Sequence, residues 1–301
     1  MVGESHPVAG GDVVLTGPQR SGTTLVCSLL NRLAGTVALD EPLPSGLFGR
    51  ADFVDALAAF FAEQRALLAS EGRAKSKVVP KGGNHAREEV PRWRGVLGAV
   101  PGRLGDRLWA RFASREIESN MGWLELDAPA QEPFTLIVKH PAAFTAALPM
   151  LVERFPCVAL VRNPLATLAS WNTVDFKRTG RAPIAERIDP ALGPRLDRIS
   201  DRYDRQISLL SWYFEKYVEH LPRARVLRYE DVVTKPSDLA VIAPAAAALT
   251  VELKSRNANT IYSARVVGAL SSRLLATDSA IWQFYERSAV ERLTEAFTRR
   301  H

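Results

Sequence analysis

Short apolar runs alternate along the chain with longer stretches whose apolar residues recur at helical spacing. The runs rich in Val, Ile and Leu predict buried strands at 13–17, 36–39, 134–139, 157–161 and 225–229. The stretches between them predict helices at 22–34, 143–155, 201–220 and 290–300, and one that begins near Pro164. Strands and helices that alternate in this way are typical of a parallel sheet covered on both faces. We therefore predict an α/β fold of three layers with a central, mainly parallel β-sheet flanked by helices.

Two stretches interrupt this alternation. Residues 42–131 begin with a helical pattern and continue with a segment rich in Pro, Gly and Arg, without a convincing strand. We interpret them as a helical insertion over one end of the sheet. Residues 177–200 contain several Gly and Pro residues and predict a long, lid-like loop. Neither stretch has the pattern of an independent domain, so we expect residues 1–301 to form a single domain.

The composition is that of an ordinary globular protein, with 47% apolar and 24% charged residues. The 39 basic residues exceed the 33 acidic ones, which favours anionic ligands. No motif that reads nucleic acid accompanies the scattered arginines, so we expect no nucleic-acid partner. The start of the sequence has no signal-peptide pattern, and the most apolar stretch, 239–251, is too short to span a bilayer. We expect a cytoplasmic protein with no membrane partner.

The turn after the first predicted strand is the main candidate for a binding site. Gly17 and Gly22 have the spacing of a Walker A loop, but Thr23 follows Gly22 where a P-loop NTPase requires lysine. The glycine turn and the helix start still direct backbone N–H groups at one point, which suits a phosphate or sulfate. Arg20 supplies a cation inside the turn, and Thr23 and Thr24 add hydroxyl donors. The missing lysine weakens the alternative of a small-molecule kinase.

Three segments carry a resemblance to a known family. PQRSGTTL, at the turn, resembles the phosphosulfate-binding loop of sulfotransferases that use 3′-phosphoadenosine-5′-phosphosulfate (PAPS), in their soluble bacterial branch. LVRNPLATLASW places Arg162 and Ser170 as in the family's element for the 3′-phosphate of the cofactor. VLRYEDVVTKP resembles the family's Arg-Tyr-Glu-Asp segment. The alternative for Arg162 is an ion pair at the surface of a helix-capping segment.

The resemblance implies a P-loop-like fold and the transfer of a sulfuryl group from PAPS to a hydroxyl or amine of a small molecule. A carbohydrate or a secondary metabolite is a candidate acceptor, the product is adenosine 3′,5′-bisphosphate, and no metal is implied. The residues that it assigns to the cofactor are Arg20, Ser21, Gly22, Thr23, Thr24, Arg162 and Ser170. Leu25 stands where the family often stacks an aromatic residue on the adenine. Tyr229 is a second candidate for that contact, although we favour the alternative of a buried structural tyrosine. Residues 271–275, SSRLL, could close over the cofactor, although they lack the family's Arg-Lys-Gly triplet.

Two residues compete for the role of general base. Glu41 follows the second predicted strand, where other bacterial and carbohydrate-directed members of the family place a glutamate. His140 follows the third, but it is adjacent to Lys139, whereas the cytosolic branch places its histidine two residues after the lysine. A shift of one residue in extended backbone turns a side chain to the opposite face. We favour Glu41 over His140, and we expect Lys139 either to assist the transferred group or to be a strand-end charge.

A non-catalytic nucleotide-binding protein of the same fold is the remaining alternative. It would be favoured if Arg20, Thr23, Glu41 and Arg162 did not converge on one site.

Overall fold

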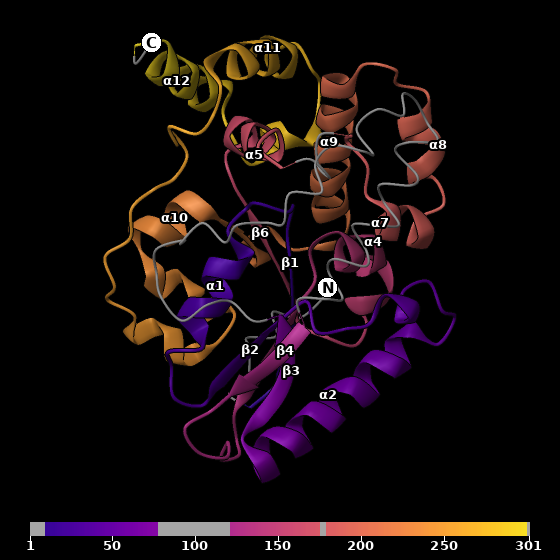
Figure 1. The fold of residues 1–301 in the computed structure, drawn as a ribbon, viewed down its shortest axis with the longest axis vertical. Helices are drawn as coiled ribbons and strands as arrows, with labels where there is room; N and C mark the ends of the chain where they lie inside the picture. Colours follow the sequence, from indigo (N-terminus) through magenta and orange to yellow (C-terminus); the bar gives the residue numbers. More distant parts are fainter. Residues whose placement is uncertain (1–9, 78–120, 175–178, 300–301) are drawn as a thin grey trace.

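A parallel five-stranded sheet forms the centre of the molecule (Figure 1). The computed structural model describes residues 10–77, 121–174 and 179–299. The strands of the sheet are β1 (Asp12–Thr16), β2 (Thr36–Asp40), β5 (Thr135–Lys139), β6 (Cys157–Val161) and β7 (Val226–Arg228). Their order is β2-β5-β1-β6-β7, and every neighbouring pair is parallel. The predicted α/β fold with a mainly parallel sheet is confirmed.

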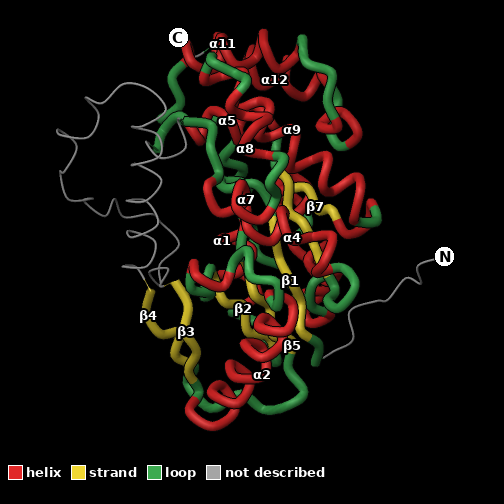
Figure 2. Tube along the Cα trace, turned by 90° about the vertical axis from the view of Figure 1, so that its right-hand side faces the viewer, coloured by secondary structure: helices red, strands yellow, loops and turns green. Residues whose placement is uncertain are grey.

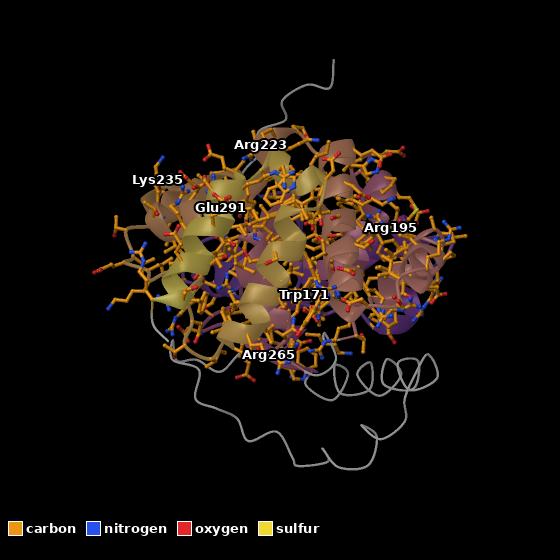
Figure 3. The ribbon with its side chains drawn as sticks, turned by 90° about the horizontal axis from the view of Figure 1, so that it is seen from above. Trp171, Arg195, Arg223, Lys235, Arg265 and Glu291 are labelled. Atoms are coloured by element: carbon orange, nitrogen blue, oxygen red, sulfur yellow. The ribbon has the colours of Figure 1, made fainter. Side chains whose placement is uncertain are left out.

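Helices cover both faces of this sheet, which explains why its strands are apolar runs and not alternating patterns. Val14 and Val138 enter one core, while Leu15 and Ile137 enter the other. The helices of the first core include α4 (Pro141–Leu151), α5 (Pro164–Trp171), α9 (Arg202–His220), α11 (Ala264–Leu275) and α12 (Arg287–Thr298). The second core includes α1 (Thr23–Leu30) and α10 (Tyr229–Thr234). Trp171 lies inside the molecule, whereas Arg195 and Lys235 project at its periphery (Figure 3).

The described part of residues 42–131 is not purely helical. Helix α2 (Phe53–Glu71) is followed by an antiparallel pair of strands, β3 (Arg73–Lys77) and β4 (Met121–Glu125), here named the β3–β4 ribbon. The ribbon lies beside β2 at the edge of the sheet (Figure 2). The Asp40 backbone N–H donates to Ser76 Oγ at 2.9 Å and joins the two. Because β3 reads RAKSK, no apolar run marks it in the sequence; residues 78–120 lie outside the described part.

The segment predicted as a long loop at 177–200 contains two short helices instead. These are α7 (Pro183–Ile188) and α8 (Leu192–Asp197), and residues 177–178 lie outside the described part. Ala185, Leu192 and Leu196 are fully buried, so the segment packs as part of the core. The prediction of an irregular lid is therefore wrong for residues 179–200.

Short 3-10 helices complete the described chain: η1 (Ser45–Leu47), η2 (Arg223–Arg225), η3 (Pro236–Val241), η4 (Pro244–Ala248) and η5 (Ala280–Gln283). Among the described helices, none has the length and apolar character needed to cross a membrane.

Candidate functional site

The turn between β1 and α1 is closely packed against two other elements. Gly17 and Gly22 have φ values of 154° and 103°, which glycine adopts readily. A Cβ at Gly17 would lie 2.3 Å from the carbonyl oxygen of Leu160, and one at Gly22 would lie 2.8 Å from Cδ2 of Tyr229. No larger residue fits either position without a shift of these neighbours.

Helix α1 opens onto this turn with a free N-terminus. Gly22 is its N-cap residue and provides no side-chain cap, so the first backbone N–H groups remain available to an anion. Ser21 Oγ is buried and has no hydrogen-bond partner among the described residues. A buried hydroxyl without a partner is unfavourable unless a ligand or a water molecule satisfies it. The turn therefore has the features of an anion site.

Helices α5 and α9 both contact the turn at Gln19, a residue to which the sequence motifs assign no role. Trp171 Nε1 of α5 donates to the carbonyl oxygen of Gln19 at 2.7 Å. Tyr213 of α9 donates its hydroxyl to Gln19 Oε1, also at 2.7 Å. These contacts hold both the backbone carbonyl and the side chain of Gln19. Because the three residues are far apart in sequence, only the packed fold brings them together.

Arg20, Arg162 and Ser170 lie together at one side of the turn. Arg20 Nε donates to Ser170 Oγ at 3.0 Å, and Arg162 Nη1 donates to the carbonyl oxygen of Arg20 at 3.0 Å. Ser170 and Arg162 are almost fully buried, with 1% and 6% of their surfaces exposed. Partial desolvation lowers the pKa of Arg20, and the Arg162 cation lowers it further. Two guanidinium groups and a hydroxyl thus share a small, positively charged region.

Arg162 is a buried, hydrogen-bonded residue and not part of a surface ion pair. Its Nε donates to Asn257 Oδ1 at 2.8 Å, and its Nη2 donates to the carbonyl oxygen of Arg256 at 2.6 Å. Asn257 in turn donates to Glu230 Oε1 at 2.7 Å. Glu230, from the Arg-Tyr-Glu-Asp segment, also accepts from the backbone N–H of Asn163 at 2.9 Å. The segment therefore has a physical role: it orients the end of β6.

Tyr229, one of the two candidates for the adenine contact, does not present a free ring at the turn. Tyr229 is 4% exposed, and the Arg162 guanidinium lies 4.9 Å from its ring centroid. Its hydroxyl accepts from the backbone N–H of Arg256 at 3.1 Å. Leu25 packs against the core on the α1 face of the sheet. Tyr229 thus fills the space between Gly22 and Arg162.

A second group of charges lies at the carboxyl ends of β2 and β5. The register of these parallel strands places Asp40 beside Lys139. Lys139 Nζ donates to Asp40 Oδ1 at 2.5 Å and to Glu41 Oε1 at 2.9 Å. Thr24, in the first turn of α1, donates its hydroxyl to Asp40 Oδ2 at 2.9 Å. The charged group and the start of α1 therefore lie side by side.

The charges in this group determine each other's protonation. Burial alone would raise the pKa of Glu41, but the ammonium groups of Lys139 and Lys77 outweigh it and hold that pKa at about 2. Burial would lower the pKa of Lys139, but Glu41 and Asp40 raise it well above its ordinary value. At neutral pH the site holds an ionised carboxylate beside a protonated amine.

His140 occupies a different environment. Its ring packs edge-on against Phe48 and Phe144, with centroid distances of 5.0 and 5.1 Å. Its Nε2 accepts from the backbone N–H of Leu43 at 3.0 Å. Burial lowers the pKa of His140 to about 3, so the imidazole is neutral. The lone pair on Nε2 is therefore already used by the backbone N–H of Leu43.

Backbone conformation marks two of the predicted site residues independently. Among the described non-glycine residues, only Arg20 and Glu41 have positive φ, at 71° and 48°. Left-handed backbone is unfavourable for residues with a Cβ and concentrates at functional sites. The structure thus holds the cation of the turn and the carboxylate after β2 in conformations that need support from their surroundings.

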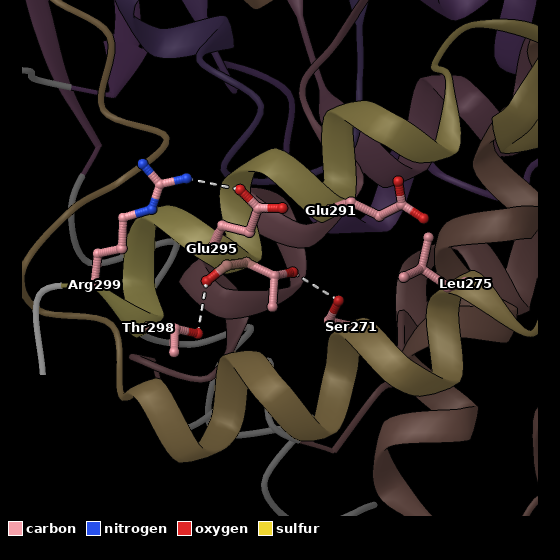
Figure 4. Close-up of a pocket in the computed structure, with 7 residues that line it drawn as sticks. Ser271, Leu275, Glu291, Glu295, Thr298 and Arg299 are labelled. Atoms are coloured by element: carbon pink, nitrogen blue, oxygen red, sulfur yellow. Dashed lines mark hydrogen bonds and ion pairs between the residues drawn. The ribbon is translucent and has the colours of Figure 1, made fainter.

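Residues 271–275 form part of a helix that packs on its neighbour. They lie in α11, where the hydroxyl of Ser271 is 2.7 Å from that of Thr294 in α12 (Figure 4). A groove of about 400 Å³ runs between these helices and is lined by Ser271, Leu275, Glu291, Thr294, Glu295, Thr298 and Arg299. Helix packing therefore engages SSRLL in the structure, and its closing over a cofactor stays a prediction.

Comparison with known proteins gives no match to a protein-family model or to a curated protein. Among solved structures, the sulfotransferase domain of the Synechococcus PCC 7002 olefin synthase aligns with 17% identity over 98% of this chain and 97% of its own, at a TM-score of 0.36. Sulfotransferase STF9 from Mycobacterium avium aligns with 15% identity over 97% of this chain and 76% of its own, at a TM-score of 0.34. At these scores any functional assignment rests on the site's own residues.

Proposed function

We propose that the protein is a PAPS-dependent sulfotransferase that transfers a sulfuryl group to a hydroxyl or amine of a small molecule. The observation that carries this proposal is the grouping of Arg20, Arg162 and Ser170 beside a phosphate-type turn without a Walker lysine. A triphosphate does not need a second cationic region beside the turn. A nucleotide with a second phosphate on its ribose does, because each phosphate requires its own donors.

The residues around the turn fit the two charged ends of such a cofactor. The free N-terminus of α1, the unpartnered Ser21 hydroxyl and the Thr23 side chain would hold the phosphosulfate. Arg162 and Ser170 would hold the 3′-phosphate. The cofactor supplies an activated sulfuryl group on a phosphate leaving group. Arg20 lies next to both regions, and its cation would stabilise the negative charge that develops on the leaving oxygen.

Glu41 is the general base in this proposal. It is ionised, its side chain is 16% exposed, and it lies on the same edge of the sheet as the turn. His140 is less suited, because its Nε2 already accepts from Leu43. Lys139 would orient Glu41 and stabilise charge on the transferred group. Arg20 lies in the turn, Thr23 begins the helix that follows it, and Arg162 donates to its backbone. Glu41 is linked to the same region through Lys139 and Thr24, and this grouping favours an enzyme over a protein that retains only the fold.

Calorimetry with adenosine 3′,5′-bisphosphate, AMP and ATP tests the proposal. A charge-assisted contact is worth about 1.5–3 kcal/mol, so we expect the bisphosphate to bind roughly ten- to a hundredfold more tightly than AMP. Arg162→Ala and the smaller change Ser170→Ala should each remove much of this preference, whereas Arg292→Ala, at an exposed position on α12, should not. Equal binding of the bisphosphate and AMP by the unmodified protein would contradict the assignment, and tighter binding of ATP would favour a kinase.

A further inference from the structure

The β3–β4 ribbon carries a row of cations on its outer face. Side chains alternate along β3, so that Ala74 and Ser76 are buried while Arg73 and Lys75 are exposed and Lys77 is partly exposed. Residues two apart in a strand lie about 7 Å from each other. The outer face therefore holds three basic side chains at regular intervals.

One end of this row reaches the proposed general base. Lys77 Nζ lies 3.9 Å from Glu41 Oε2. The hydrogen bond from the Asp40 backbone N–H to Ser76 Oγ fixes this end of β3 against the end of β2. The end of β3 thus lies beside the end of β2 that leads into Glu41, and the ribbon lies next to β2 in the fold (Figure 2).

An exposed aromatic ring lies within the same row. Trp123 of β4 faces Lys75 across the ribbon and is 42% exposed. The Arg73 guanidinium lies 4.7 Å from its ring centroid, and Lys75 Nζ lies 6.0 Å away. Arg73 is neutralised by an ion pair with Glu71 at 2.6 Å, but Lys75 has no ion-pair partner within the described parts of the chain. A cation without an ion-pair partner in the described residues therefore lies beside a ring that is 42% exposed and that Arg73 covers in part.

We propose that this outer face binds the acceptor, and that the acceptor is an anionic alcohol containing a ring. This inference rests on the proposed sulfotransferase function. The ring would stack on Trp123, the acidic group would pair with Lys75, and the reacting hydroxyl would lie at Glu41. Lys75 lies one strand repeat, about 7 Å, beyond Lys77, and Lys77 Nζ is 3.9 Å from Glu41 Oε2, so the acidic group would lie farther than about 7 Å from the reacting oxygen. The second cation, Lys77, would screen the acid from the carboxylate of Glu41.

Matched acceptor pairs test this inference. Each pair differs only in the acid: 4-nitrophenyl β-glucuronide with 4-nitrophenyl β-glucoside, and 3-(4-hydroxyphenyl)propanoate with its amide. Binding to the protein saturated with adenosine 3′,5′-bisphosphate and turnover with PAPS are both measured. We expect the acid to be preferred in at least one pair, and the pair that shows the larger preference distinguishes a sugar from a phenol. Neutral compounds that bind and react as well as both acids would overturn the inference, as would the failure of both acids to bind.

Substitutions in the β3–β4 ribbon provide a second test of the acceptor inference. An exposed ion pair contributes up to about 1 kcal/mol, so Lys75→Gln should raise KM for the preferred acid by roughly two- to fivefold and leave KM for its neutral partner unchanged. Lys235→Gln, at an exposed lysine on the periphery (Figure 3), is the matched control. Trp123→Ala should weaken the binding of both acceptors of a pair, and Trp123→Phe should restore much of that binding. Unchanged KM values in Lys75→Gln would count against the inference.

Cofactor binding by the same variants separates the two proposals. Lys75→Gln and Trp123→Ala should bind adenosine 3′,5′-bisphosphate as the unmodified protein does. If the bisphosphate binds and neutral acceptors are preferred, the acceptor inference alone fails. If the bisphosphate does not bind even to the unmodified protein, the sulfotransferase proposal fails and the inference fails with it.

Discussion

Glu41→Gln should reduce the loss of stability that the protein undergoes in acid. The Glu41 carboxylate accepts from Lys139 Nζ at 2.9 Å and lies 3.9 Å from Lys77 Nζ. These contacts outweigh its burial and hold its pKa at about 2, against an ordinary value of 4.5. A carboxyl whose pKa is lower in the folded state stabilises that state above the unfolded pKa. This contribution is lost as the pH falls from 4.5 through 2.

The magnitude follows from the difference between the two pKa values. A difference from 4.5 to about 2 corresponds to about 3 kcal/mol of stability at pH 7. At pH 3 the unfolded carboxyl is almost fully protonated while the folded one is still mostly ionised, so about 1 kcal/mol remains. The Glu41 carboxyl should therefore account for about 2 kcal/mol of the stability that the protein loses between pH 7 and pH 3.

Urea unfolding followed by circular dichroism at pH 7, 5, 4 and 3 measures this contribution. The unmodified protein should lose about 2 kcal/mol more than Glu41→Gln over that range. Glu63→Gln, at an exposed glutamate on α2, should follow the unmodified protein. The absolute stability of Glu41→Gln at pH 7 does not enter the comparison. Stability curves of the same slope for all three proteins would refute the electrostatic account of the site.

Three further predictions concern the turn and the two candidate bases. Arg20→Ala should lower kcat more than cofactor affinity, and Arg20→Lys should retain substantial activity; a loss of affinity alone would contradict a role at the leaving oxygen. Glu41→Gln should lower kcat by roughly 10²–10⁴-fold, with His140→Asn costing much less activity; the reverse order in steady-state assays would make His140 the base. Gly22→Ala should lower the melting temperature, because its Cβ would lie 2.8 Å from the Tyr229 ring at a φ of 103°; unchanged melting would show that the ring moves aside.

The sequence predicts four of the five strands because each is a short apolar run that is almost entirely buried. The fifth, β7, is a shorter run and is only partly buried. The sequence also predicts the turn from the spacing of Gly17 and Gly22. The structure explains this spacing, because both positions have backbone conformations and close contacts that suit only glycine. The sequence does not predict the β3–β4 ribbon, whose first strand alternates charged with small residues. The sequence therefore does not reveal Lys77 as a neighbour of Glu41.

Long-range packing sets the rest of the site, and no local pattern encodes it. Asp40 ends an apolar strand, and its pairing with Lys139 depends on β2 lying beside β5, which are almost a hundred residues apart. The contact of Gln19 with Trp171 requires α5 to pack behind the turn. Asn257 lies in an irregular segment without a motif, yet it accepts from Arg162. Such residues can be recognised as part of the site only when the packing of the strands and helices is known.

The charges at the ends of β2 and β5 also constrain how the site would work. A carboxylate with a pKa of about 2 is a weak base. Among the cations that lower the pKa of Glu41, Lys139 has the largest effect. The same lysine contacts Asp40, which accepts from Thr24 at the mouth of the turn. An anion bound at the turn would attract Lys139 and add negative charge near Glu41, and both effects raise the pKa of Glu41. In the proposed mechanism the base is therefore strengthened when the donor is bound, and it remains weak in the empty site.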